Sequence, residues 1–214
     1  NAATKSTYTH LNVDAVLNCA ESLGAFYPDH VKLYQHIGMV DDAGGYVDFV
    51  NDPVFRSQLF NFLRSLTATT TVATDTNTDN PNNNNNIQNP PSTLLVHCVF
   101  GRSRSVAVVM LILFLRARVR GDNTATMVEL YRQLHTLRPL ACLNRVFYTG
   151  LKEFETAFNN HADFRSTWLS VFDSQDNDAT TTNTPTPTTS SKPTQTGWSE
   201  PFTDNCIHNN QFER

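Results

Sequence analysis

Apolar and polar residues form three short extended patterns in this chain, and each pattern predicts a strand. Residues 13–18 alternate between apolar and polar positions, and residues 31–37 do so again. Residues 93–96 are a mostly apolar run that leads directly into His97 and Cys98. The third run is apolar enough to predict a buried strand.

Apolar residues recur at helical spacing between and after these strands. An Asn-Asp-Pro sequence at residues 51–53 is a helix start, and apolar residues follow it every three or four positions through residues 54–66. A nearly unbroken apolar run at residues 106–115 predicts a buried helix, with Gly121 as its C-cap. Strands and helices therefore alternate through this part of the chain.

The pattern after Gly121 is helical. A helix is predicted to begin at Asn123 or Thr124 and to end at Arg138-Pro139, with apolar residues along its inner side. A last helical region is predicted over residues 144–172, with a break near Asn159-Asn160.

Two segments have no apolar periodicity. Residues 67–92 are rich in Thr, Asp and Asn, and residues 173–214 are rich in Thr, Pro, Ser and Asn. Such compositions bury too little apolar surface to order the chain. We therefore predict one folded domain at residues 1–172, with a disordered insertion at residues 67–92, and a low-complexity tail at residues 173–214.

Composition narrows the class of protein. Hydrophobic residues make up 39% of the 214 residues and charged residues 17%, and the net charge is -4. An acidic balance argues against general binding to nucleic acid, and the longest apolar run is too short to cross a membrane. No signal peptide is recognised, and the first residue is Asn1 rather than Met, which predicts a fragment. The four cysteines fit no zinc-binding spacing. We expect no metal and no cofactor.

The segment after the third predicted strand carries the candidate chemistry. Five residues with a central Gly101 separate Cys98 from Arg104, and the apolar run that follows predicts a helix. Backbone N–H groups at a helix N-terminus can converge on an anion, and the same field lowers the pKa of a cysteine. Arg104 adds a planar charged fork that matches phosphate oxygens. A thiolate beneath a phosphate cradle predicts nucleophilic phosphoryl transfer.

This segment, His97-Cys98-x5-Arg104-Ser105, resembles the active-site signature of the cysteine-dependent protein phosphatases, and most closely that of the dual-specificity branch. The resemblance extends over about residues 13–158, apart from the insertion. It includes a V-L-N-x-A strand at residues 16–20, a strand that leads to Asp41, and an R-P-x4-N-x-x-F element at residues 138–147. It implies an α/β fold with a central, twisted, mostly parallel sheet of four to five strands flanked by helices.

The resemblance also implies roles for individual residues. Cys98 is the nucleophile, Asp41 is the general acid and then the general base, and Ser105 donates a hydrogen bond to the sulfur as it leaves. Arg104 and the backbone N–H groups of the loop hold the phosphate oxygens; the loop residues are Val99, Phe100, Gly101, Arg102, Ser103 and Arg104. His97 orients the loop through hydrogen bonds, and Asn144 either braces the loop or caps a helix. No metal is required.

Three departures from the family pattern stand out. The strand pair that usually precedes V-L-N has no room here, so either the sequence is a fragment or the sheet is shortened at its N-terminus. Phe100 replaces a residue that is commonly small, and Val146 replaces a frequent glycine. None of these departures removes a catalytic group.

The predicted function is therefore hydrolysis of phosphotyrosine, phosphoserine and phosphothreonine in proteins. Two alternatives stay open: a phosphatase that acts on a phosphoinositide, an RNA 5′-end or a glucan, and an inactive module that binds phosphoproteins. The expected partners are phosphoprotein substrates and a protein kinase, with no nucleic acid and no membrane. A thiolate nucleophile needs a reducing compartment, so a cytoplasmic or nuclear location is expected.

Overall fold

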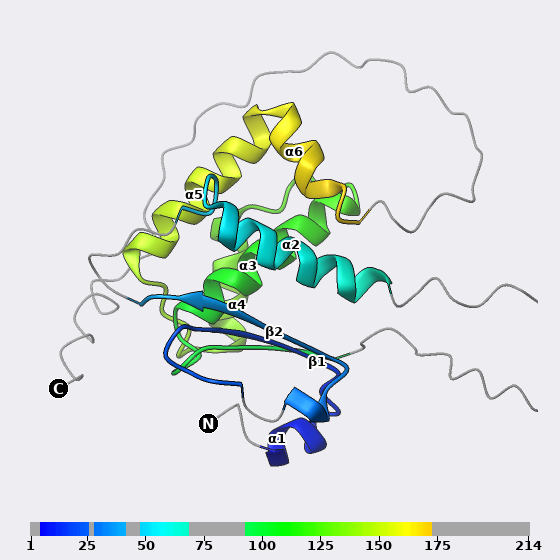
Figure 1. The fold of residues 1–214 in the computed structure, drawn as a ribbon. Helices are drawn as coiled ribbons and strands as arrows, with labels where there is room; N and C mark the ends of the chain where they lie inside the picture. Colours follow the sequence, from blue (N-terminus) through cyan, green and yellow to red (C-terminus); the bar gives the residue numbers. More distant parts are fainter. Residues whose placement is uncertain (1–4, 26–27, 42–47, 69–92, 173–214) are drawn as a thin grey trace, which may run out of the picture. The chain divides into compact units, whose positions relative to one another are not determined.

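The structure of the protein is a computed structural model, and it describes residues 5–25, 28–41, 48–68 and 93–172. Helices and strands alternate in its first half, and helices follow in its second (Figure 1). The elements are α1 (Lys5–His10), β1 (Ala15–Ala20), η1 (Pro28–His30), β2 (Leu33–Met39), α2 (Pro53–Ala68), β3 (Leu94–His97), α3 (Arg104–Val119), α4 (Met127–Leu137), α5 (Arg145–Asn160) and α6 (Ala162–Leu169).

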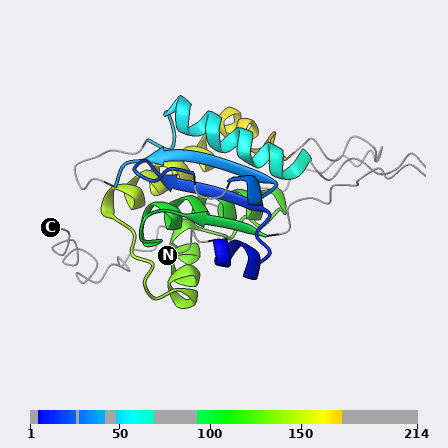
Figure 2. The ribbon, with the colours of Figure 1, turned by 60° about the horizontal axis from the view of Figure 1, so that its bottom comes forward.

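The described strands form one parallel sheet in the order β2-β1-β3, with β1 between its two partners (Figure 2). Leu17 at the middle of β1 pairs with Gln35 of β2 and with Val96 of β3. Every residue of β1 is buried, as is typical of a strand covered on both faces. The predicted parallel α/β fold is confirmed. The described part of the sheet has three strands, which agrees with the expectation of a sheet shortened at its N-terminus.

Helix α1, which the sequence did not predict, covers one face of the sheet. Its Tyr8 packs with Val13 and Val16, and the partly buried Tyr34 and Leu95 pack against them. In Figure 1 this helix lies below the sheet, whereas α2, α3, α5 and α6 lie above it. The helix was missed because it is short and its residues show no apolar periodicity.

Helix α3 is the centre of the helical layer and confirms the predicted buried helix. Its Phe114 meets Phe158 of α5 edge to face, with 5.3 Å between the ring centroids. Phe154 of α5 meets Trp168 of α6 in the same way at 5.1 Å, and Trp168 is completely buried. Large aromatic side chains contribute strongly to packing, so α5 and α6 fix the position of α3 and of the loop at its N-terminus.

The predicted helix ends are confirmed at most places. The Asp52 carboxylate accepts the backbone N–H of Val54 at 2.9 Å and so caps α2. Arg120 is the C-cap of α3, and Gly121, the predicted C-cap, lies one residue beyond it with a φ of 78°. Helix α4 ends directly before Arg138-Pro139, and His161 separates α5 from α6 near the predicted break.

The predicted start of α4 at Asn123 or Thr124 is wrong, because the helix begins at Met127. The Asp122 carboxylate accepts the backbone N–H of Thr124 at 2.9 Å and holds this segment in a turn. Thr126 is the N-cap instead, and its hydroxyl accepts the N–H of Glu129 at 3.2 Å. Asp122 and Thr126 can each cap a helix, and the sequence alone does not show which of them does so.

Helix α2 continues through Thr67 and Ala68, the first two residues of the predicted insertion. The remainder of that prediction, residues 69–92, and the predicted tail, residues 173–214, lie outside the described residues.

A buried carboxylate joins α5 to the start of α4. Glu155 is 9% exposed, and its two carboxylate oxygens lie 3.3 and 3.4 Å from the backbone nitrogen of Met127, which donates to them. Burial raises the pKa of Glu155, and the Met127 N–H, Arg118 and Lys152 oppose this more weakly. The folded state therefore favours the protonated form. The stability that this group contributes is present at acidic pH and is lost as the pH rises toward the raised pKa.

We expect Glu155→Gln to become more stable relative to the wild type as the pH rises from acidic to neutral. The amide keeps the size of the side chain and removes the cost of a buried charge. Urea unfolding of both proteins across this pH range measures the difference. Glu153→Gln, at an exposed position of the same helix, is the matched control, and equal pH dependence in the two variants would contradict the prediction.

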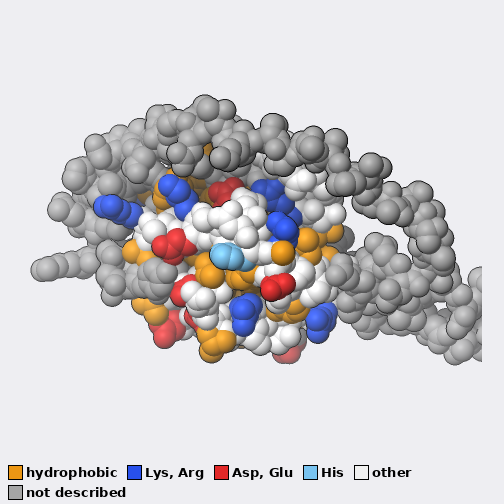
Figure 3. Space-filling view, turned by 90° about the horizontal axis from the view of Figure 1, so that it is seen from above, with side chains coloured by type: hydrophobic (Ala, Val, Ile, Leu, Met, Phe, Trp, Pro, Cys, Tyr) orange, Lys and Arg blue, Asp and Glu red, His pale blue; other side chains and the backbone are white. Residues whose placement is uncertain are grey.

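Acidic and basic side chains are interspersed on the face seen from above in Figure 3, so no patch of one sign dominates the described surface there. Within the described ranges, no helix is both long and apolar enough to cross a membrane.

Candidate active site

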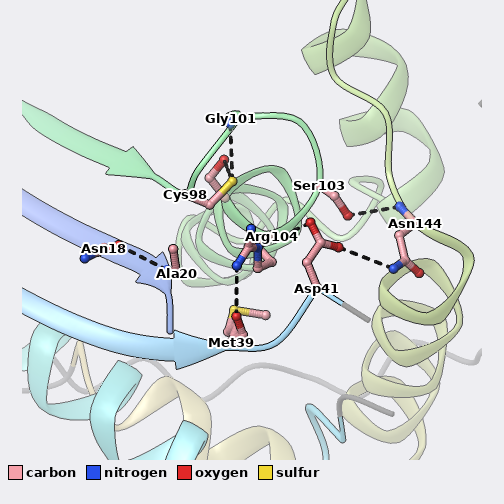
Figure 4. Close-up of polar contacts among 10 residues, drawn as sticks. Asn18, Ala20, Met39, Asp41, Cys98, Gly101, Ser103, Arg104 and Asn144 are labelled. Carbon is pink, nitrogen blue, oxygen red and sulfur yellow. Dashed lines mark hydrogen bonds and ion pairs between the residues drawn. The ribbon is translucent and has the colours of Figure 1, made fainter. Parts of the chain in front are cut away.

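The loop between β3 and α3 is the centre of the candidate active site (Figure 4). It leaves the C-terminal end of β3 and enters the first turn of α3, as predicted. Gly101 has a φ of 65°, a conformation that glycine adopts without steric cost. A Cβ at this position would also lie 3.1 Å from Nη2 of Arg138. Glycine is therefore required both by the backbone conformation and by the close approach of Arg138.

The Cys98 sulfur is surrounded by hydrogen-bond donors. The Gly101 N–H donates to Sγ at 3.3 Å (Figure 4). The Ser105 hydroxyl lies 3.4 Å from Sγ. Burial opposes the thiolate, but hydrogen bonds from Ser105 and Gly101 and the charge of Arg104 outweigh it. The pKa of Cys98 is therefore lower than that of an ordinary cysteine, as expected for a nucleophile or an anion-binding thiolate.

We expect Ser105→Ala to raise the pKa of Cys98, because the Ser105 hydroxyl contributes the largest of the effects that lower it. The pH dependence of Cys98 alkylation by iodoacetamide measures this, and its midpoint should move to higher pH. Ser57→Ala, at an exposed position on α2, is the control. An unchanged midpoint in Ser105→Ala would show that the hydroxyl does not stabilise the thiolate.

Arg104 is 6% exposed and is held by the end of β2. Its Nη1 donates to the Met39 carbonyl at 3.2 Å, and its Nε lies 3.3 Å from a carboxylate oxygen of Asp41. The contact with Met39 was not predicted, because a backbone carbonyl leaves no signal in the sequence. It fixes the plane of the guanidinium beside Cys98.

Asp41 lies two residues beyond the end of β2, where the family resemblance places the general acid. Its carboxylate contacts Arg104 and also accepts a hydrogen bond from Nδ2 of Asn144 at 3.4 Å (Figure 4). The side chain is 30% exposed, so a substrate can reach it. Its neighbour Asp42 lies outside the described residues.

Two further carboxylates close to Asp41 in sequence have structural partners. Asp48 accepts the backbone N–H groups of Val50 and Asn51 at 3.0 and 2.8 Å, and Asp52 caps α2. The carboxylate of Asp48 stabilises a turn and that of Asp52 caps a helix. Asp41 has neither of these structural tasks, which favours it as the candidate acid.

Asn144 performs both of the tasks that the sequence left open. Its side-chain oxygen accepts the Val146 N–H at 2.7 Å and caps α5. Its backbone N–H donates to the Ser103 hydroxyl at 3.1 Å, and its side-chain amide reaches Asp41. One residue thus connects the loop, the candidate acid and the start of α5.

The segment at residues 138–144 forms hydrogen bonds with three consecutive loop residues, Gly101, Arg102 and Ser103. Arg138 donates from Nε to the Gly101 carbonyl at 3.0 Å, and the Cys142 N–H donates to the Arg102 carbonyl at 2.9 Å. The third contact joins Asn144 to Ser103. Sequence reasoning placed this segment behind the loop but missed the individual roles of Arg138 and of the Ser103 side chain.

His97 is 2% exposed, and its predicted orienting hydrogen bonds are not formed with good geometry within the described residues. Burial lowers its pKa, the Cys98 backbone opposes this, and His36 adds to the lowering. A neutral, buried imidazole therefore supports the loop mainly by packing.

Cys19 lies close enough to Cys98 and Arg104 to interact with both electrostatically. Burial raises the pKa of Cys19, Cys98 raises it further, and Arg104 lowers it. Cys19 therefore favours its thiol form, whereas the thiolate is favoured at Cys98, and both are free cysteines.

The remaining loop residues differ in exposure. Val99 is half-buried, and Phe100 is 56% exposed. A cavity of about 470 Å³ lies against this side of the loop, between β3 and Leu134 of α4. Cys98 and Gly101 line it, whereas Arg104 and Asp41 do not. Within the described ranges, no group of three or more His, Cys, Asp or Glu residues is placed to hold a metal ion.

Comparison with known proteins gives similarity in structure but not in sequence. No protein-family model and no curated protein matches the chain. The crystal structure of human DUSP28 is similar with a TM-score of 0.51 and 18% identity, over 74% of this chain and 88% of that chain. A mouse putative dual specificity phosphatase complexed with zinc tungstate has a TM-score of 0.51 and 16% identity, over 74% of this chain and 79% of that chain.

The Yvh1 phosphatase domain from Chaetomium thermophilum is similar to the same degree, with a TM-score of 0.51 and 16% identity, over 74% of this chain and 88% of that chain. These similarities confirm the fold that the sequence resemblance implied. The chain has the fold of the dual-specificity phosphatases.

Proposed function

We propose that the protein hydrolyses phosphotyrosine, phosphoserine and phosphothreonine in other proteins, through a cysteinyl-phosphate intermediate. The environment of the Cys98 sulfur carries this proposal. The sulfur has a lowered pKa, accepts the Gly101 N–H and lies close enough to Arg104 to feel its charge, and Asp41 contacts Arg104. This combination supplies a nucleophile, a charge that stabilises phosphate oxygens and a proton donor.

In the first step the Cys98 thiolate attacks the phosphorus, and a sulfur–phosphorus bond forms as the bond to the substrate oxygen breaks. Asp41 transfers its proton to the departing oxygen. Arg104 and the loop N–H groups stabilise the negative charge on the other three phosphate oxygens. A phosphate that binds Arg104 competes with its present ion pair to Asp41, which frees the carboxyl group for the leaving oxygen.

In the second step a water molecule attacks the phosphorus, and the sulfur–phosphorus bond breaks with its electron pair returning to Cys98. Asp41 accepts a proton from the water. The Ser105 hydroxyl, 3.4 Å from the sulfur, donates to the thiolate as it leaves. A hydrogen bond to a charged group contributes about 1.5–3 kcal/mol, so this contact favours hydrolysis of the intermediate.

Protein substrates are supported by the loop sequence and by the fold. The loop has no lysine to meet the additional phosphates of an inositol lipid, and the proteins with similar folds include dual specificity phosphatases. Phosphoproteins are therefore the partners that we propose.

We expect Asp41→Asn to lower kcat on a phosphopeptide by about 100-fold or more, because general acid catalysis typically contributes 10²–10⁴-fold. The loss should be smaller on aryl phosphates with good leaving groups, which need little protonation. Steady-state kinetics on both kinds of substrate measure the two effects.

Asp42→Asn is the matched control, since it makes the same change one residue away and should have a modest effect. If Asp42→Asn showed the large loss of kcat and Asp41→Asn the modest one, the general acid would be Asp42. Full activity of both variants on a phosphopeptide would remove Asp41 from the mechanism.

The function itself is tested by turnover on a panel of phosphopeptides, phosphoinositides and RNA with a 5′ phosphate. Rapid acid quench with a radiolabelled phosphopeptide should trap phosphate on Cys98, and peptide mapping identifies the labelled residue. Faster turnover of a phosphoinositide or an RNA than of any phosphopeptide would show that the substrate is not a protein. Tight vanadate binding without turnover of any substrate would indicate a binding module.

A further inference from the structure

Three exposed apolar side chains gather beside the loop between β3 and α3. Phe100 in the loop is 56% exposed, Leu137 at the end of α4 is 82% exposed, and Leu140 is 64% exposed. Phe100 directly precedes Gly101, whose carbonyl accepts a hydrogen bond from Arg138, the residue after Leu137. The two segments are therefore no farther apart than the length of one arginine side chain. We call Phe100, Leu137 and Leu140 the apolar rim.

Local structure does not explain why the residues of the apolar rim are apolar. Leu140 is part of a turn, where glycine, proline and small polar residues dominate. Leu137 is in the last turn of α4 and is almost fully exposed, so it contributes little to the core. Exposed apolar side chains that lie close together mark a binding surface, and residues that break local preferences are expected at functional sites.

The cavity of about 470 Å³ beside the loop adjoins the apolar rim. Its exposed lining residues are Phe100 and Arg138, so it opens at the rim. Its other lining residues include apolar side chains from β3, α3 and α4, which are Leu95, Val96, Val106, Val109 and Leu134. Cavities of about 300–1,000 Å³ with mostly apolar walls are typical binding pockets.

The cavity is connected to the candidate active site, because Cys98 and Gly101 also line it. A side chain in the cavity can therefore belong to the same molecule as a phosphate held over the sulfur. No Asp, Glu or Lys is among the described residues that line the cavity, and the Nε of Arg138 is already bound to the Gly101 carbonyl. An apolar side chain suits these walls better than a charged one, whose burial without a partner is costly.

We propose that the apolar rim and the cavity form a subsite for a large apolar side chain next to the phosphorylated residue. The protein then prefers phosphopeptides with Leu, Met or Phe at that position. Burial of such a side chain stabilises the complex in proportion to the apolar area removed from water. The inference rests on the proposed function and specifies its substrate.

Binding of phosphotyrosine peptides to a Cys98→Ser protein tests this without depending on turnover. Three peptides differ only in the residues on each side of the phosphotyrosine, which are Leu, Asn or Glu. Leu and Asn have similar shapes, so their comparison isolates the effect of apolar surface. We expect the Leu peptide to bind about tenfold more tightly than the Asn peptide, as for partial burial of one side chain. Because salt screens charges, this preference should persist at high salt, whereas a preference for Glu would not.

Adding Leu137→Asn and Leu140→Asn together to this protein should remove most of the preference for the Leu peptide. Leu11→Asn is the matched control, because Leu11 is 50% exposed and precedes β1, at the opposite end of the sheet from the loop. It should leave the preference unchanged. Vanadate should bind all of these proteins equally, which shows that the phosphate cradle is intact.

Equal affinities for the Leu and Asn peptides, or equal losses in the rim variant and the Leu11 control, would overturn the inference. Tighter binding of the Glu peptide than of the Leu peptide would also overturn it. A dimer that the rim substitutions convert to monomers, with no preference for the Leu peptide, would assign the rim to a second copy of this chain instead. The proposed function would be unaffected by any of these results, since trapping of phosphate on Cys98 tests it separately.

Discussion

Cys98→Ser is expected to abolish hydrolysis, with kcat lowered by about 10⁴-fold or more, as for loss of other catalytic nucleophiles. The serine hydroxyl has a much higher pKa than the thiol, and the donors that stabilise a thiolate here cannot ionise it. No labelled intermediate should form in acid-quench experiments. Vanadate should still bind, because the Gly101 N–H and Arg104 remain in place.

Calorimetric titration with vanadate shows whether the loop of Cys98→Ser is intact. Cys206→Ser makes the same chemical change in the C-terminal segment and should leave kcat unchanged. Substantial hydrolysis by Cys98→Ser would remove Cys98 as the nucleophile. Loss of vanadate binding together with activity would mean that the substitution disrupts the loop.

Arg104→Lys is expected to lower kcat/KM by about 100-fold or more, within the range for loss of one group that stabilises transition-state charge. Lysine keeps the positive charge but not the planar fork. In the structure one end of the fork is bound to the Met39 carbonyl while Nε faces Asp41. A lysine ammonium cannot keep the same orientation with both contacts, so the phosphate oxygens would lose a fixed donor pair.

Kinetics on a phosphopeptide together with vanadate affinity measure this loss, and both should fall. Arg116→Lys makes the same change at an exposed position of α3 and should have no effect. Wild-type turnover by Arg104→Lys would show that only the charge at this position matters, which would contradict the role assigned to its geometry.

The sequence by itself determined the elements whose signals are local. The apolar run before Cys98 and the longer one after Arg104 predicted a buried strand and a buried helix, and therefore the loop between them. The capping residues Asp52 and Gly121 also marked helix ends correctly. These predictions hold because strand length, helical spacing and left-handed glycine turns depend on residues close together in the chain.

Tertiary structure decided which residues meet at the loop. Asn144 and Asp41 are far apart in the chain, yet their side chains form a hydrogen bond, and the Met39 carbonyl orients Arg104 from another strand. Arg138 reaches the Gly101 carbonyl in the same way. No pattern of side chains marks a backbone carbonyl as an acceptor.

The misplaced start of α4 and the unpredicted α1 have a related cause. Asp122 and Thr126 are both good capping residues, and only the hydrogen bond from the Met127 N–H to Glu155 of α5 shows which one begins the helix. Helix α1 has a single large apolar contact, Tyr8, whose burial depends on β1 and β3. Local sequence thus determined the elements and the place of Cys98 between a strand and a helix. Contacts between distant residues determined how the loop is held, because those hydrogen bonds and that burial exist only once the chain has folded.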